Sequence, residues 1–431
     1  MLFLAGIVDI LIVPILLAIG LIVGLLLLAS GMSSNRTREG ESQVAESFLK
    51  GLNGKRHDRV GQKGRKPSGI RIGLQYRYPA ELAPNQNWRD RRESEIIYEG
   101  DDSVYDLRID REPNPHVIIV GESGSGKSTT LSTFLIRSRS RLGIPFLVID
   151  WSGTYRDFAP GVKLWEVPDG LRINPFRLFG MTPARRSGIA AELLQFSLNL
   201  TDLQAQRVRD MLHDFYSKGR EPTINEICDE ISRSTTNRQH LYFLVNKLRP
   251  MAEVFGEEPE EFWKEYDKRC NVIELEGLTD TEKSLVTNSV LQRIVESFKA
   301  QSETKLYISL DDAYQVIKSY EGRESPITKI VREGRKYGFG LVIATQLLQD
   351  IPDSVIGNTS LKFIHSYHES YGARRIHDTL ALSDLQKRIL HLLPTGHCLL
   401  FDQYAMKDGS GHPAYVEIDR VSEPEKEEMA K

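Results

Sequence analysis

The chain has 431 residues, of which 27% are charged, and a net charge of −3. This length allows two or three domains with full cores. Its 56 basic and 59 acidic residues exclude a protein coated in positive charge, so any contact with nucleic acid must come from local patches. Three cysteines without close spacing, Cys228, Cys270 and Cys398, exclude a disulfide framework and a cysteine-rich zinc site.

The first 30 residues are very apolar, because 24 of them are Ala, Val, Ile, Leu, Met or Phe. Ile10–Ser30 contains no charge and is long enough to span a bilayer core, which needs about 20 apolar residues. The alternative is a cleaved signal peptide. Against it, no Lys or Arg precedes the run, and the run exceeds the usual 7–15 residues or so. We therefore expect residues 1–31 to be a transmembrane anchor.

Residues 32–69 are rich in Ser, Gly, Asn, Arg and Lys, and this composition predicts a flexible basic linker. The positive charge after the apolar run places everything beyond residue 31 in the cytoplasm, as expected for a single-pass protein of the cell membrane. Lys55–Lys66 carries six basic residues against one acid. This stretch can attract anionic lipid, and contact with DNA phosphates is the secondary reading.

Short alternating patterns in residues 70–110, at Ile70–Tyr78, Ile96–Tyr98 and Val104–Ile109, predict a small β-rich lead-in.

A phosphate-binding loop follows. The buried strand Val117–Val120 runs into Gly121-Glu-Ser-Gly-Ser-Gly-Lys-Ser128, which has the spacing Gly-x4-Gly-Lys-Ser, and a helical pattern comes next. Backbone N–H groups of such a loop and the helix N-terminus bind a phosphate chain. Lys127 can reach the β- and γ-phosphates of ATP, and the Ser128 hydroxyl can bind Mg²⁺. The predicted nucleotide-binding residues are Gly121, Glu122, Ser123, Gly124, Ser125, Gly126, Lys127, Ser128 and Thr129.

Two later strands end in acids that could complete this site. Phe146–Ile149 is followed by Asp150, and Leu306–Leu310 is followed by Asp311 and Asp312. Only the second strand offers adjacent carboxylates, so we assign Asp311 to the metal and Asp312 to the attacking water. Asp150 is expected at the rim of the site. An Asp after an apolar strand can also simply initiate a turn.

A further strand, Leu341–Thr345, ends in Gln346, which can hydrogen bond the γ-phosphate or its water; the alternative is a surface cap. Upstream, Arg332 and Arg335 are three residues apart and share one helix face. A positioned arginine offsets the charge that develops in phosphoryl transfer, whereas the simpler reading is a solvated basic helix end.

Buried strands at about 117–120, 146–149, 271–275, 306–310, 341–345, 363–366 and 397–401 alternate with helical stretches, which predicts an α/β fold with a mostly parallel sheet. Residues 182–268 read as an inserted helical subdomain. In it, Val208, Met211, Leu212, Phe215 and Tyr216 share one helix face, and Thr223-x-x-Glu226 forms a capping box. The charged tail, residues 422–431, is expected to be disordered.

The motifs and their order resemble the HerA/FtsK superfamily of P-loop ATPases over about residues 100–420. The segments that carry the resemblance are Asn114–Ser128, Val148–Tyr155, Ile173–Phe176, Asn271–Leu275, Glu333–Gly338 and Ala344–Gln346. The resemblance implies a RecA-like ATPase domain, here residues 111–421, in a hexameric ring that threads DNA or protein. The family usually has Asp-Glu where this chain has Asp311-Asp312, and often Glu where it has Thr154.

These observations favour a membrane-tethered ATPase that moves double-stranded DNA in division, conjugation, a mobile element or virus packaging. The alternatives are a secretion-type ATPase that moves protein, or a scaffold that binds ATP and turns it over slowly because Asp312 replaces Glu. An ABC transporter subunit is disfavoured, because the sequence contains no Leu-Ser-Gly-Gly-Gln run.

Overall fold

The computed structural model describes residues 69–76, 100–109, 112, 114–177, 181–233, 235–299, 305–312, 314–317, 325–334, 336, 338–346, 351–367, 376–380, 382, 384–405 and 413–430. The predicted anchor, almost all of the predicted linker, the predicted strand 96–98 and Arg335 lie outside these residues. Among the described residues, no helix is both long and apolar enough to cross a bilayer.

The described strands join one sheet, in the order β2-β1-β11-β10-β9-β3-β8-β7-β4-β6-β5. Their bounds are β1 Ile70–Tyr76, β2 Gly100–Leu107, β3 Val117–Val120, β4 Phe146–Asp150, β5 Lys163–Glu166, β6 Asn271–Glu274, β7 Leu306–Asp311, β8 Phe339–Thr345, β9 Leu361–Ile364, β10 His397–Asp402 and β11 Ala414–Ile418. The strands from β9 to β5 are parallel, and β10, β11, β1 and β2 extend the sheet as antiparallel strands. The predicted mostly parallel α/β sheet is therefore confirmed.

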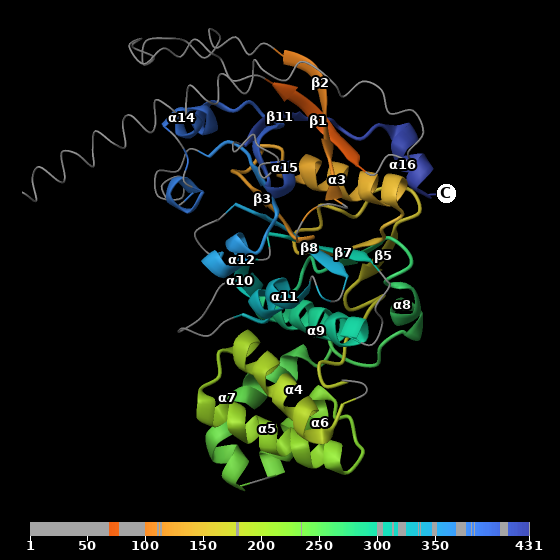
Figure 1. Ribbon diagram of the computed structural model, residues 1–431. Coiled ribbons are helices and arrows are strands. Elements are labelled where there is room, and N and C mark those ends of the chain that lie inside the picture. Colours follow the sequence, from red (N-terminus) through yellow and green to blue (C-terminus); the bar gives the residue numbers. More distant parts are fainter. Residues whose placement is uncertain are drawn as a thin grey trace, which may run out of the picture. The chain divides into compact units, whose positions relative to one another are not determined.

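The helices separate into those that cover the sheet and those of the insertion (Figure 1). Their bounds are α3 Lys127–Leu142, α4 Pro183–Leu198, α5 Asp202–Ser217, α6 Ile224–Arg233, α7 Thr235–Met251, α8 Glu260–Glu265, α9 Asp280–Lys299, α10 Tyr314–Ile317, α11 Pro326–Gly334, α12 Asp353–Gly357, α14 Asp384–Leu392, α15 Gln403–Ala405 and α16 Glu423–Ala430.

The central parallel strands are buried along their whole length, which explains their continuous runs of Val, Ile and Leu. Helix α3 covers one face of the sheet, where Phe134 meets the edge of the Tyr307 ring at 5.0 Å between centroids. On the other face, Phe298 of α9 meets Phe339 of β8 at 5.6 Å. The helices on both faces exclude water from these strands.

The helical insertion forms as the sequence indicates. The five apolar residues of the predicted face of α5 are all buried, and α5 packs with α4 and α7. Helix α6 begins after the predicted capping box, in which the Thr223 backbone N–H donates to Glu226 Oε2 at 2.8 Å and the Glu226 N–H donates to Thr223 Oγ1 at 3.3 Å. Such reciprocal bonds satisfy two N–H groups that a helix start would otherwise leave open.

The prediction of a disordered tail is wrong for residues 423–430, which form α16 against α3. Ser422 begins this helix, because its N–H and Oγ both donate to Glu425 Oε2, at 2.9 and 3.0 Å. Glu425 also accepts from Arg137 Nε of α3 at 3.0 Å, and Met429 is buried. The sequence analysis considered only the many acidic residues of this segment. It therefore missed the Ser422–Glu425 cap and the apolar residue Met429 that the helix buries.

The strands of the predicted β-rich lead-in continue the main sheet, since β1 pairs with β11 as well as with β2. The sequence pattern missed β5 and β11. Both are short and carry charged or polar residues next to apolar ones, so neither shows the unbroken apolar run that marks the central strands.

Candidate nucleotide site

The phosphate-binding loop connects the carboxyl end of β3 to the start of α3. Gly126 has φ 112°, a conformation that L side chains rarely adopt, and a Cβ on it would lie 2.9 Å from the backbone nitrogen of Gly396. A Cβ on Gly121 would lie 2.6 Å from both His365 Cβ and Ser125 Oγ. Glycine is therefore required at Gly126 by conformation and by space, and at Gly121 by space.

The start of α3 has the properties of an anion-binding site. Its N-cap residue is Gly126, which makes no side-chain capping bond, and the first turn contains no acid. Ser125 Oγ is buried and has no hydrogen-bond partner among the described residues. Backbone N–H groups that lack side-chain caps, together with the positive end of the helix dipole, suit a phosphate. The loop therefore fits the phosphate chain of a nucleotide.

Lys127 lies between this loop and a pair of carboxylates. Its Nζ donates to the Glu122 backbone oxygen at 3.0 Å. Burial lowers the pKa of Lys127, while the nearby carboxylates of Asp312, Asp311 and Glu122 act in the opposite direction. Lys127 and the Asp311–Asp312 pair are about 185 residues apart along the chain. The parallel arrangement of β3, β8 and β7 brings them to one edge of the sheet.

Asp311 ends β7 and is almost fully buried. Burial raises its pKa to about 6, and the charge of Asp312 acts in the same direction. The Tyr155 hydroxyl donates to Asp311 Oδ2 at 2.7 Å and opposes this rise. A carboxylate with one oxygen held in this way can serve as a fixed ligand for a cation.

Asp312 has φ 52°, in the left-handed region that Asp tolerates better than most residues. Its N–H donates to the Ala344 backbone oxygen at 3.0 Å, and its Oδ2 accepts from Gln346 Nε2 at 3.2 Å. Asp312, which the sequence assigned to the attacking water, therefore lies in contact with Gln346, which was expected to bind the γ-phosphate or its water.

Asp150 fulfils the simpler of its two predicted roles. It is fully buried, and its carboxylate accepts backbone N–H bonds from Ser152 at 3.1 Å and from Tyr155 at 2.8 Å. Asp150 thus initiates a turn, and this role is compatible with the expected position at the rim of the nucleotide site. It neighbours Asp311 across the β4–β7 pair.

The remaining predicted residues are placed in part. Ser128 lies beside Tyr155, and Ser123 is exposed at the tip of the loop. Arg332 is an exposed residue of α11. Arg335 lies outside the described residues.

Sequence reasoning missed His365, which packs against the phosphate-binding loop and the start of α3. Its backbone N–H donates to the Val120 oxygen at 2.8 Å, its Nε2 lies 2.8 Å from Thr130 Oγ1, and its Nδ1 lies 2.8 Å from the His397 backbone oxygen. Burial lowers the pKa of His365 to about 4, so the ring is neutral at pH 7. A histidine directly after the buried strand β9 was the signal that could have indicated this role.

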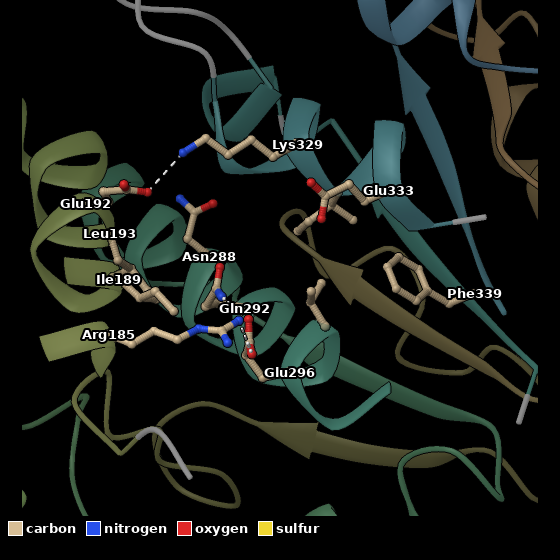
Figure 2. Close-up of a pocket in the computed structure, with 12 residues that line it drawn as sticks. Arg185, Ile189, Glu192, Leu193, Asn288, Gln292, Glu296, Lys329, Glu333 and Phe339 are labelled. Carbon is tan, nitrogen blue, oxygen red and sulfur yellow. Dashed lines mark hydrogen bonds and ion pairs between the residues drawn. The ribbon is translucent and has the colours of Figure 1, made fainter. Parts of the chain in front are cut away.

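A cavity of about 260 Å³ lies elsewhere, between α4, α9, α11 and the start of β8 (Figure 2). Two ion pairs cross it, Lys329 to Glu192 at 2.9 Å and Arg185 to Glu296 at 3.2 Å. They link the insertion to the helices that cover the sheet. No residue of the phosphate-binding loop lines this cavity.

Comparison with known proteins identifies the domain. Residues 97–294 match the family model described as "Helicase HerA, central domain". This part of the chain is similar to the central domain of HerA, and the match covers less than half of the chain. The resemblance to the HerA/FtsK superfamily is thereby confirmed, and the family implies nucleotide binding and ATPase activity.

Individual relatives are distant. The DNA double-strand break repair helicase HerA of Sulfurisphaera tokodaii is 24% identical over 344 residues, 71% of this chain and 65% of the relative. The DNA import protein CedB of Sulfolobus acidocaldarius is 21% identical over 255 residues, 56% of this chain and 42% of the relative. The chain thus spans less than two thirds of the length of these curated relatives.

Two solved structures share the fold of this chain. VirB4 of Thermoanaerobacter pseudethanolicus superimposes with a TM-score of 0.65 at 16% identity, covering 84% of this chain and all of that one. The bacterial conjugative coupling protein TrwBdeltaN70 gives a TM-score of 0.57 at 14% identity, covering 84% and 96%. At these identities the likeness establishes the fold alone.

Proposed function

We propose that this chain is a membrane-anchored, ATP-hydrolysing motor of the HerA type that moves double-stranded DNA through a hexameric ring. The observation that carries the enzymatic part is the position of Lys127, which lies between the phosphate-binding loop and the Asp311–Asp312 pair. One cation at that point faces both a phosphate-binding surface and two acids, as ATP hydrolysis requires.

ATP and Mg²⁺ fit the residues present. The loop offers backbone N–H groups without side-chain caps and the unpartnered Ser125 hydroxyl. Ser128 and Asp311 supply the oxygen ligands that Mg²⁺ prefers. When bound, Mg²⁺ neutralises charge on the phosphates. Asp312 and Gln346 are then the groups that orient and polarise water, because they share a hydrogen bond next to Lys127.

DNA is the substrate that the curated relatives favour, since both the HerA helicase and CedB carry names that refer to DNA. A slow ATP-binding scaffold is the second candidate, because the Asp312 side chain is one methylene shorter than the glutamate usual in the family. A secretion-type ATPase that moves protein is an outcome that the next experiment would reveal.

Double-stranded DNA should stimulate ATP hydrolysis by the full chain in detergent at low salt, with little sequence preference. Contacts between basic groups and phosphates are independent of sequence. They weaken steeply as the salt concentration rises, because the release of counterions from DNA then gains less free energy. The measurement is the ATPase rate against DNA concentration at two salt concentrations, with DNAs of unrelated sequence. Absence of stimulation by DNA, together with stimulation by a secreted protein, would favour the secretion ATPase.

The ring makes a separate prediction. If Arg332 or Arg335 completes a neighbour's site, an Arg335→Ala chain mixed with an Asp311→Ala chain should recover part of the activity that each lacks alone, because a mixed ring contains some intact interfaces. The ATPase rate of the mixture, compared with the rates of the separate chains, checks this. A fully active monomer would contradict the ring.

The membrane part of the proposal rests on the apolar run Ile10–Ser30 and the basic residues that follow it. In this arrangement residues 32–69 tether a cytoplasmic motor to the cell membrane. Release of the chain from membranes by detergent, and not by salt alone, tests this part; release by salt would remove the anchor.

A further inference from the structure

The loop Trp151–Arg156 lies across the carboxyl edge of the sheet and is fixed at both ends. At its start, Asp150 accepts the N–H groups of Ser152 and Tyr155. At its end, Arg156 Nε donates to Glu274 Oε2 of the neighbouring strand β6 at 3.0 Å. Tyr155 lies between these anchors and is 3% exposed. The loop therefore holds the Tyr155 ring in one position.

The Tyr155 hydroxyl connects the two residues assigned to Mg²⁺. It donates its proton to Asp311 Oδ2 at 2.7 Å. The Ser128 side chain lies beside the Tyr155 hydroxyl.

A serine hydroxyl that binds a cation uses an oxygen lone pair and still needs an acceptor for its proton. Tyr155 Oη lies beside Ser128 and is therefore placed to accept that proton when a cation is bound. The same phenol fixes one oxygen of Asp311, so the other is presented in a constant direction. Groups that hold metal ligands in this way set metal affinity without touching the metal.

We propose that Tyr155 is a positioning residue for Mg²⁺, acting through the relay from Ser128 to Tyr155 to Asp311. This inference rests on the proposed ATPase function and deepens it. The competing view is a buried tyrosine that only packs, since Tyr155 also contacts the Phe158 ring at 5.6 Å. A packing role would not depend on the hydroxyl, so removing that group alone distinguishes the two.

The experiment compares wild type with Tyr155→Phe in the full chain, by titration of a fluorescent, non-hydrolysable ATP analogue with and without Mg²⁺. We expect affinity without Mg²⁺ to stay within about twofold of wild type. The Mg²⁺ concentration for half-maximal binding should rise by about tenfold or more, as is typical when a partner of a metal ligand is lost. In an Asp311→Asn background, Tyr155→Phe should have a smaller effect, because the carboxylate that its hydroxyl holds is no longer there.

Tyr216→Phe is the matched control. Its hydroxyl is also buried and donates to the Phe176 backbone oxygen at 2.9 Å, but it belongs to the helical insertion. This variant should keep the wild-type Mg²⁺ dependence. An unchanged Mg²⁺ dependence in Tyr155→Phe would overturn the proposal, and so would an equal loss of affinity without Mg²⁺. The readout is binding, so a wild-type chain that binds Mg²⁺ and the analogue but never hydrolyses ATP would refute the proposed motor and leave the relay standing.

Discussion

Replacing Lys127 with alanine should abolish ATP turnover without unfolding the protein. The ammonium is the cation next to both the phosphate-binding loop and the Asp311–Asp312 pair, so it stabilises the charge that develops on the γ-phosphate. Removing one such group typically slows an enzyme by about 10²–10³-fold. The variant also leaves two neighbouring carboxylates without their cation, so we expect a loss at or beyond the upper end of that range.

The fold should survive this change. The Lys127 side chain makes one described hydrogen bond, to the Glu122 backbone oxygen, and alanine is the residue that favours helix most. The measurements are the ATPase rate and the thermal unfolding temperature. Lys247→Ala is the control, because its Nζ also donates to a backbone oxygen, that of Leu198 at 3.1 Å, within the insertion. Normal turnover in Lys127→Ala would refute the assignment of the phosphate-binding loop.

The parts of the site that directly follow a buried strand were predictable from the sequence. The loop, Lys127 and the Asp311–Asp312 pair each follow a buried apolar strand, and parallel strands bring their carboxyl ends to one edge. The contact between Asp312 and Gln346 follows in the same way, because β7 and β8 are adjacent and parallel.

The parts that depend on side chains distant in sequence were not predictable. Tyr155 and Asp311 are 156 residues apart, and Thr130 and His365 are 235 apart. No periodicity or local spacing encodes such pairs, since they arise only when the strand order is known. The helix α16 was missed for a different reason, because its stability comes from the contact of Glu425 with Arg137 on α3 and not from a local apolar face.

The largest remaining effect is expected at Asp312. Its carboxylate stops about 1.5 Å short of a glutamate's, and a base must come within about 3 Å of the water it polarises. The backbone at Asp312 has φ 52° and its N–H donates to the Ala344 oxygen, so the residue is held in a turn where its carboxylate accepts from Gln346. Asp is among the residues that tolerate this left-handed conformation, whereas a longer side chain gains reach at a cost of about 1–2 kcal/mol in strain.

Asp312→Asn should therefore keep ATP binding and lose turnover by about 10²–10⁴-fold, the usual contribution of a positioned general base.

Asp312→Glu separates the motor from the slow scaffold. In an efficient motor the extra methylene disturbs a working geometry and lowers the rate, whereas in a slow scaffold it brings the carboxylate to the water and raises the rate. The measurements are single-turnover hydrolysis and nucleotide affinity for both variants, with thermal unfolding to detect the strain. If neither substitution changes the rate, Asp312 does not polarise the water. Gln346 and Asp150 then become the candidates, and Asp150 already accepts the N–H groups of Ser152 and Tyr155.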